Sequence, residues 1–158
     1  MRDTLVYLII EPDGKLTERS RQKMSNEIAC VDLSPIGTNS SESEVCAIGL
    51  WNDISVSLLS LPDMAVLDRS ELGGDIIPRS VLLNSFSSVP YLFVSIGDGT
   101  LFYYPIENGK LGKKKRVQLG TQPTSLNKFE TKNGPTVFAC SDSQGSQTRA
   151  GKILGNQN

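Results

Sequence analysis

The stretch AIGLWNDI at residues 47–54 returns in outline as FVSIGDGT at residues 93–100, with an apolar run, a polar turn and the start of another run. The second copy begins 46 residues after the first (93 − 47). A second pair of matching stretches, PRSV at 78–81 and PTSL at 123–126, has an offset of 45 residues (123 − 78). Repeats of about 40–50 residues with four short strands each are typical of β-propeller blades.

Short runs rich in Val, Ile, Leu, Phe and Tyr recur between turn-forming clusters, as β-strands do. Pro-Asp-Gly at 12–14, Gly-Asp-Gly at 97–99 and Glu-Asn-Gly at 107–109 are such clusters. Only Leu16–Glu27 is a candidate helix, and its apolar residues are too sparse to form a stripe facing a core. The sequence therefore predicts an all-β fold. The expected strands are Thr4–Ile10, Ile28–Leu33, Val45–Leu50, Ile54–Leu61, Ala65–Leu67, Ser80–Leu83, Tyr91–Ile96, Thr100–Ile106, Arg116–Leu119, Thr124–Lys128 and Thr136–Cys140.

These strands group into four-stranded antiparallel blades over about 25–72 and 76–120. Residues 1–24 would hold the remnant of an earlier blade, and 121–142 the first strands of a later one. Two whole and two partial blades cannot close a ring of typically four to eight, so we expect a partial β-propeller of about three blades with open edges. Residues 143–158 are poor in strand formers, and we expect a polar, disordered tail and a truncated product.

The composition argues against an enzyme. The 158 residues include no histidine, which excludes imidazole bases, Ser-His-Asp triads and the usual zinc sites. Gly97-Asp98-Gly99 begins like a dinucleotide fingerprint, but no helix follows it, so we interpret it as a hairpin tip. We therefore expect no catalytic residue, no metal and no cofactor.

The cysteines and the N-terminus indicate a reducing compartment. Cys30, Cys46 and Cys140 are widely spaced within apolar runs, which predicts free, buried thiols. The longest apolar stretch near the N-terminus, Leu5–Ile10, is too short for a signal peptide, and no stretch approaches the roughly 20 residues that span a bilayer. We expect an intracellular, soluble protein without membrane contact.

A basic run, Lys110, Lys113, Lys114, Lys115 and Arg116, is the strongest charge feature. Such a run can contact phosphates, but no aromatic residues interleave it, and the net charge of the chain is −1. We favour an outer hairpin whose lysines protect a sheet edge, and keep nucleic-acid binding as the alternative.

Trp51, the one tryptophan, is followed by Asn52 and Asp53 at an expected strand–turn junction. A tryptophan is usually buried, whereas one at the tip of a turn is often an anchor for a partner. These residues alone leave both interpretations open.

Six sequence islands, in one order, resemble the second β-propeller of a known family. They are EIAC at 27–30, CAIGLW at 46–51 with DIS at 53–55, LGGDIIPRS at 72–80, GDG at 97–99 with LFY at 101–103, LGTQPT at 119–124 and FACSD at 138–142. The family is that of the large subunit of the damage-specific DNA-binding protein, the adaptor of cullin-4 RING ubiquitin ligases. The resemblance covers about residues 5–142.

The resemblance implies a non-enzymatic scaffold that acts in DNA repair and protein ubiquitination in the nucleus and cytoplasm. Its second propeller docks the cullin, and Glu27 and Trp51 match positions on that face, beside Asn52 and Asp53. Substrate receptors bind the other two propellers, which this chain does not match, so we expect receptors only where those propellers are present. Two alternatives remain: a nucleic-acid-binding subunit of a polyadenylation or splicing complex, for which we expect weak direct contact, and a product without independent function.

Overall fold

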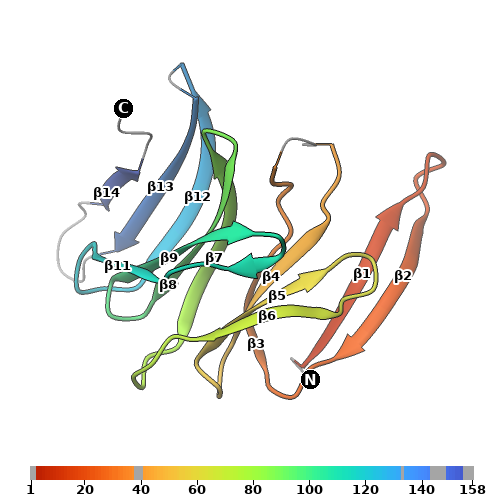
Figure 1. Cartoon of the computed structure of the whole chain (residues 1–158), viewed down its shortest axis with the longest axis horizontal. Coiled ribbons are helices and arrows are strands. Elements are labelled where there is room, and N and C mark those ends of the chain that lie inside the picture. The colour runs from red at the N-terminus through yellow and green to blue at the C-terminus, as the bar shows by residue number, and fades with distance from the viewer. Residues whose placement is uncertain (1–2, 38–40, 133, 143–148, 155–158) are drawn as a thin grey trace.

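A computed structural model describes residues 3–37, 41–132, 134–142 and 149–154. These residues form four antiparallel sheets, and no helix occurs among them, so none there could cross a membrane. The sheets follow one another along the chain and lie side by side, with the first and the last on opposite sides of the molecule (Figure 1). The fold is therefore all-β, and it agrees with the predicted partial propeller whose ring is not closed.

The first sheet is a hairpin of β1 (Thr4–Ile10) and β2 (Leu16–Lys23). The segment Leu16–Glu27, whose sparse apolar residues argued against a helix, is a strand over most of its length, although the sequence did not predict this strand. The turn at 12–14 folds this polar segment back onto the apolar β1, where all of its residues except Arg19 gain a partner in the ladder. No residue of β2 is fully buried, which is consistent with its sparse apolar residues.

The second and third sheets contain the predicted blades. In the second, consecutive strands are neighbours, in the order β3 (Ile28–Asp32), β4 (Val45–Leu50), β5 (Ser55–Ser60), β6 (Val66–Glu71). In the third, β7 (Pro78–Phe86) pairs with β8 (Val89–Ile96), which pairs with β9 (Thr100–Glu107). Two short outer strands, β10 (Lys110–Leu111) and β11 (Lys115–Gln118), both pair with β9. The Gly97-Asp98-Gly99 segment is a hairpin turn, as predicted, with Gly99 at φ 79°.

The fourth sheet has the order β12 (Thr124–Thr131), β13 (Gly134–Asp142), β14 (Arg149–Leu154). The sequence predicted a disordered tail from residue 143, whereas 149–154 form a strand. Its backbone pairs with β13 from Asp142 to Val137. An open strand edge gives even a weak strand former a row of hydrogen-bond partners, which explains the difference. The remaining tail positions, 143–148 and 155–158, lie outside the described residues.

Each pair of neighbouring sheets shares a hydrophobic cluster. Met24 and Ile48 belong to the cluster around the first and second sheets, Val56 and Leu83 to that of the second and third, and Leu101 and Val137 to that of the third and fourth. Because the sheets bury their apolar faces against one another, each depends on its neighbour for stability.

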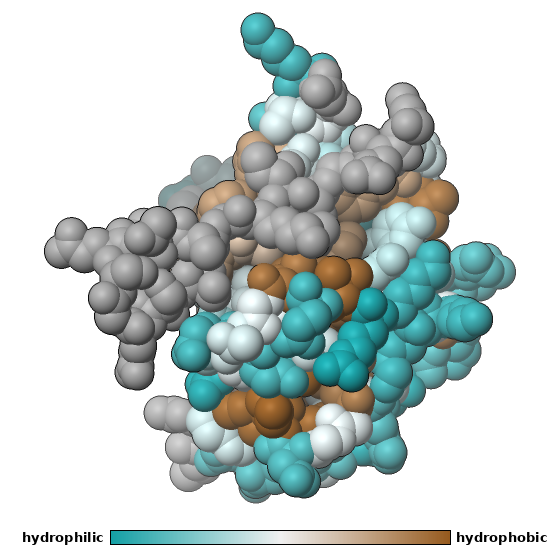
Figure 2. Space-filling model, turned by 90° about the vertical axis from the view of Figure 1, so that its left-hand side faces the viewer, coloured by the Kyte–Doolittle hydropathy of each residue, from teal (hydrophilic) through white to brown (hydrophobic). Residues whose placement is uncertain are grey.

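Apolar side chains also reach the surface. Figure 2 shows hydrophobic patches between polar residues on the side of the molecule that lies at the left in Figure 1. Exposed apolar side chains are expected where a propeller has open edges. The large exposed side chains are Leu8, Ile10, Leu16, Val31, Leu33, Trp51, Val66, Ile76, Val89 and Phe129.

One carboxylate connects the second sheet to the third. Asp32, at the end of β3, accepts a 2.6 Å hydrogen bond from the backbone N–H of the fully buried Leu83 in β7. Its other oxygen accepts bonds from the backbone N–H (3.1 Å) and the hydroxyl (2.8 Å) of Ser34. The side chain therefore fixes the position of one inner strand relative to the next.

All three cysteines are free, as predicted: Cys46 is buried, and Cys30 and Cys140 are partly buried. Burial raises the pKa of the Cys30 thiol to about 11. Burial, and then the nearby Asp32 carboxylate, raises the pKa of Cys46 to about 11. Both thiols are therefore protonated and unreactive at neutral pH.

Replacing Asp32 by alanine should lower the free energy of unfolding by about 1–3 kcal/mol, because the buried N–H of Leu83 loses its acceptor. Urea denaturation of the two proteins measures the change. Asp63→Ala is the matched control: this carboxylate is exposed, and the structure records no hydrogen bond or ion pair for it among the described residues. If both variants unfold at the same urea concentration, Asp32 does not hold the sheets together.

Alkylation should distinguish the two buried thiols from ordinary cysteine. At pH 8 the thiolate fraction of a thiol with a pKa of about 11 is roughly a hundredfold below that of an unperturbed cysteine, so Cys30 and Cys46 should react that much more slowly than in the urea-unfolded chain. Peptide mapping after iodoacetamide treatment measures both rates. Since the folded chain retains protons that the unfolded chain releases, stability should also fall as the pH rises from about 9 to about 11.

Candidate protein-binding surface

Two connections meet at one end of the second sheet. The segment between β2 and β3 carries Glu27, and the turn between β4 and β5 carries Trp51 and Asn52. The backbone N–H of Trp51 donates a 2.8 Å hydrogen bond to the carbonyl of Glu27. Residues that are 24 positions apart in the sequence (51 − 27) are thus held together by the main chain.

Three of the four predicted partner-binding residues are exposed on this surface, which we call the tryptophan patch: Glu27, Trp51 and Asn52. Trp51 is 38% exposed, so its side chain is not wholly buried, and its role as an anchor for a partner stays a prediction. An indole exposed at the end of a well-packed strand is a side chain that a partner can cover.

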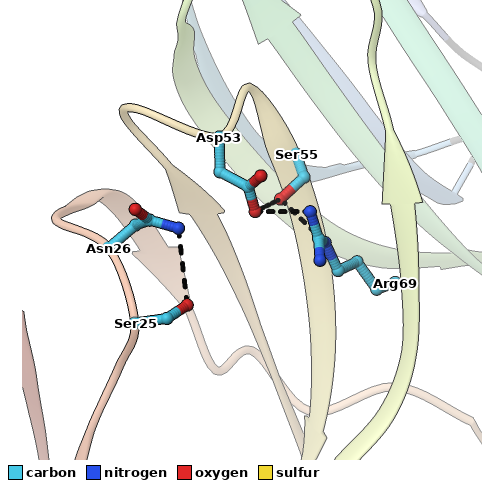
Figure 3. A network of polar contacts seen from close by, with 5 residues as sticks. All are labelled: Ser25, Asn26, Asp53, Ser55 and Arg69. Atoms are coloured by element: carbon cyan, nitrogen blue, oxygen red, sulfur yellow. Dashed lines mark hydrogen bonds and ion pairs between the residues drawn. The ribbon is translucent and has the colours of Figure 1, made fainter.

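Asp53 differs from the other three because it has a structural role within the turn. Its carboxylate accepts a 3.0 Å hydrogen bond from the Ser55 hydroxyl and forms an ion pair of 2.5 Å with Arg69 (Figure 3). The Nε of Arg69 also donates to the Ser55 hydroxyl, at 3.3 Å. Asp53 therefore attaches the turn to β6. It affects the tryptophan patch indirectly, because it holds the backbone of the turn that carries Trp51 and Asn52.

The turn also carries strain. Ile54 has a φ of 45°, which a β-branched residue rarely adopts. Arg69 was not identified from the sequence, because its position opposite Asp53 depends on the pairing of β5 with β6. The adjoining connection is itself polar, with a 3.4 Å bond from the Asn26 amide to the Ser25 hydroxyl (Figure 3).

The basic run lies on the outer edge of the third sheet, where the sequence predicted an outer hairpin. Lys110 donates to the carbonyl of Leu67 at 2.5 Å. Lys114 donates to the carbonyls of Glu71 and Leu72 at 3.1 and 3.3 Å, and its ammonium lies 5.1 Å from the centre of the Phe102 ring. Two of the five cations thus connect the third sheet to the end of the second.

The other cations of the run are Lys113, Lys115 and Arg116, all exposed. Lys115 lies 5.6 Å from the centre of the Tyr103 ring. These rings were not recognised as neighbours of the run, because β11 meets β9 only through the sheet register. Among the described residues, no group of three His, Cys, Asp or Glu side chains could hold a metal ion.

Comparison with known proteins gives consistent matches. A family model described as the RSE1/DDB1/CPSF1 second beta-propeller matches residues 1–145. DNA damage-binding protein 1 of Drosophila melanogaster is 44% identical over 140 residues, which is 87% of this chain and 12% of that protein. DNA damage-binding protein 1a of Arabidopsis thaliana (46%) and DNA damage-binding protein 1 of rice, Oryza sativa subsp. japonica (49%), match over 87% of this chain and 13% of their own length. The chain therefore spans about an eighth of these relatives.

Replacing Asp53 by alanine should loosen the turn that carries Trp51 without unfolding the sheet. The Asp53–Arg69 pair is partly exposed, so we expect a loss of less than about 1 kcal/mol in global stability but clearly faster amide exchange at residues 51–54. Hydrogen exchange measured by mass spectrometry reports both. Glu18→Ala is the control, since it removes another exposed ion pair, with Arg21 on β2. Equal exchange in the turn of both variants would contradict the role given to Asp53.

Proposed function

Because the chain belongs to the RSE1/DDB1/CPSF1 second beta-propeller family, we propose that it acts as a non-enzymatic scaffold element of a cullin-4 RING ubiquitin ligase. In this proposal the chain acts through protein–protein contacts, and the cullin binds to the tryptophan patch. In the longer relatives this element forms part of a protein named for binding damaged DNA, so the cellular role we propose is in the DNA damage response and in protein ubiquitination. The nucleus and cytoplasm are the proposed locations.

The observation that carries this proposal is the exposure of Trp51 on a rigid base. Leu50, the preceding residue, is buried, and the backbone of Trp51 is bonded to Glu27. A partner that covers the indole gains its hydrophobic free energy without first having to order the turn. Tryptophan is also among the residues most enriched in interface hot spots.

The charge on the tryptophan patch indicates what the cullin should supply. Glu27 is exposed, and it takes part in no ion pair among the described residues. A docking segment with an apolar side chain for the indole and a lysine or arginine for Glu27 would be complementary to it. The segment can be a helix or an extended strand, because both can present an apolar side chain and a basic one together.

Nucleic-acid binding through the basic run is the weaker candidate. Lys110 and Lys114 are already bonded to carbonyl oxygens of the second sheet, so contact with phosphates would have to break these bonds. Substrate receptors, which would use other propellers of a longer protein, are not assigned to any surface of this chain.

Trp51→Ala should weaken binding of the chain to the purified N-terminal region of a cullin-4 by about tenfold or more, because the anchor of the interface is removed. Isothermal titration calorimetry measures the affinity. The matched control is Val66→Ala, which removes another exposed apolar side chain (54% exposed), on the outer strand β6. An affinity of the Trp51 variant within twofold of the original chain would refute the docking site.

A further inference from the structure

A hollow of about 450 Å³ opens between the connection from β6 to β7 and the outer strands of the third sheet. Its size falls within the range of about 300–1,000 Å³ that is usual for ligand sites. We call it the inter-sheet groove and define it by six of its lining residues: Leu72, Ile76, Ile96, Phe102, Lys114 and Arg116. We infer that it binds a short extended segment of a partner protein that carries an apolar side chain next to an acidic one.

The internal repeat places a glycine next to two residues that line the groove, Ile96 and Asp98. With the offset of 46 residues, Gly97 occupies in the second repeat the position of Trp51 in the first (97 − 51). A Cβ atom on Gly97 would lie 2.9 Å from Cγ2 of Ile76, so a larger residue would displace that side chain. The second repeat therefore has no side chain at the position where the first carries an indole.

The floor of the groove is apolar. Leu72, Ile96 and Phe102 belong to the core that joins the second and third sheets, and they are nearly fully buried. Ile76 stands at the edge and is 39% exposed. Water in contact with this floor would be released by an apolar side chain of a partner, which favours binding of a hydrophobic anchor.

The rim supplies positive charge that the chain leaves unpaired. Among the described residues, no carboxylate lies within ion-pair distance of Lys114 or Arg116. Arg116 reaches only the neutral oxygens of Thr100 and Gln118, at 3.4 and 3.5 Å. A carboxylate from a partner would give this guanidinium its preferred, charge-assisted hydrogen bonds.

Two acidic residues that also line the groove set the orientation of the segment. Asp98 is engaged, because its carboxylate accepts a 2.8 Å bond from the backbone N–H of Thr100. Asp75 is exposed and would repel a second carboxylate. The acidic residue of the partner must therefore lie toward Arg116. A free inorganic anion would leave the floor in contact with water, and a purely apolar segment would leave Arg116 unpaired.

Two labelled peptides test the inference: Ser-Gly-Asp-Leu-Phe-Gly-Ser and its basic counterpart, in which lysine replaces the aspartate. Fluorescence anisotropy with the 158-residue chain should give an affinity about tenfold higher for the acidic peptide. Arg116→Gln and Ile76→Ser should each weaken its binding by about fivefold, because they remove the charge partner and part of the apolar wall. Both positions are exposed, so the fold should tolerate these changes.

The matched control for charge is Lys113→Gln, which removes an exposed cation of the same run that does not line the groove, and binding should change by less than about twofold. Trp51→Ala should leave peptide binding unchanged, which separates this site from the proposed cullin surface. Equal affinities for the two peptides, equal losses in the Arg116 and Lys113 variants, or no binding of the acidic peptide at millimolar concentration would each overturn the inference.

Discussion

The hydrogen bond from the buried N–H of Leu83 to Asp32 is the contact that determines how the second and third sheets meet. Apolar packing holds the sheets together, but it is not directional, and a sheet could slide over its neighbour with little loss. A carboxylate that accepts this buried N–H favours one relative position, because any other leaves the N–H of Leu83 without an acceptor. The two hydrophobic clusters on either side of β7 therefore pack against a strand whose position is set by this bond.

Surface features at the ends of the strands depend on this alignment. Trp51 follows a strand whose last five residues are buried. The inter-sheet groove lies between the third sheet and the connection from β6 to β7, so a shift of the second sheet would move one of its walls. Lys110, in β10, and Lys114, just before β11, connect the same two sheets at the outer edge, where both donate to carbonyl oxygens of β6. Hydrogen bonds therefore connect the second and third sheets at both their inner and their outer strands. The surfaces at the ends of these strands are held in place before any partner arrives.

The sequence predicts the fold well because the repeat, the alternation of apolar runs and the turn chemistry agree. The Asn108–Gly109 turn has positive φ values of 51° and 73°, as an Asn-Gly hairpin requires. The sequence misses three strands, β2, β10 and β14. Of these, β2 has one apolar residue and β14 lies in a segment poor in strand formers, and both exist because a neighbouring edge offers backbone partners. Their formation is a property of the pairing, which local composition does not encode.

For the binding surfaces, sequence reasoning identifies residue types but not their surroundings. Trp51 and Glu27 could be named, yet their juxtaposition depends on one main-chain hydrogen bond that no side-chain pattern predicts. In the basic run, five cations within seven residues are compatible with a phosphate site when only the sequence is considered. In the structure, carbonyl oxygens and aromatic rings from neighbouring strands lie next to several of these cations. Once Lys110 and Lys114 are used inside the molecule, Arg116 is the one of the three remaining cations that lies beside an apolar hollow. A single guanidinium over a hydrophobic floor selects an acidic side chain with an apolar neighbour, whereas a nucleic-acid backbone would need several free cations in a row.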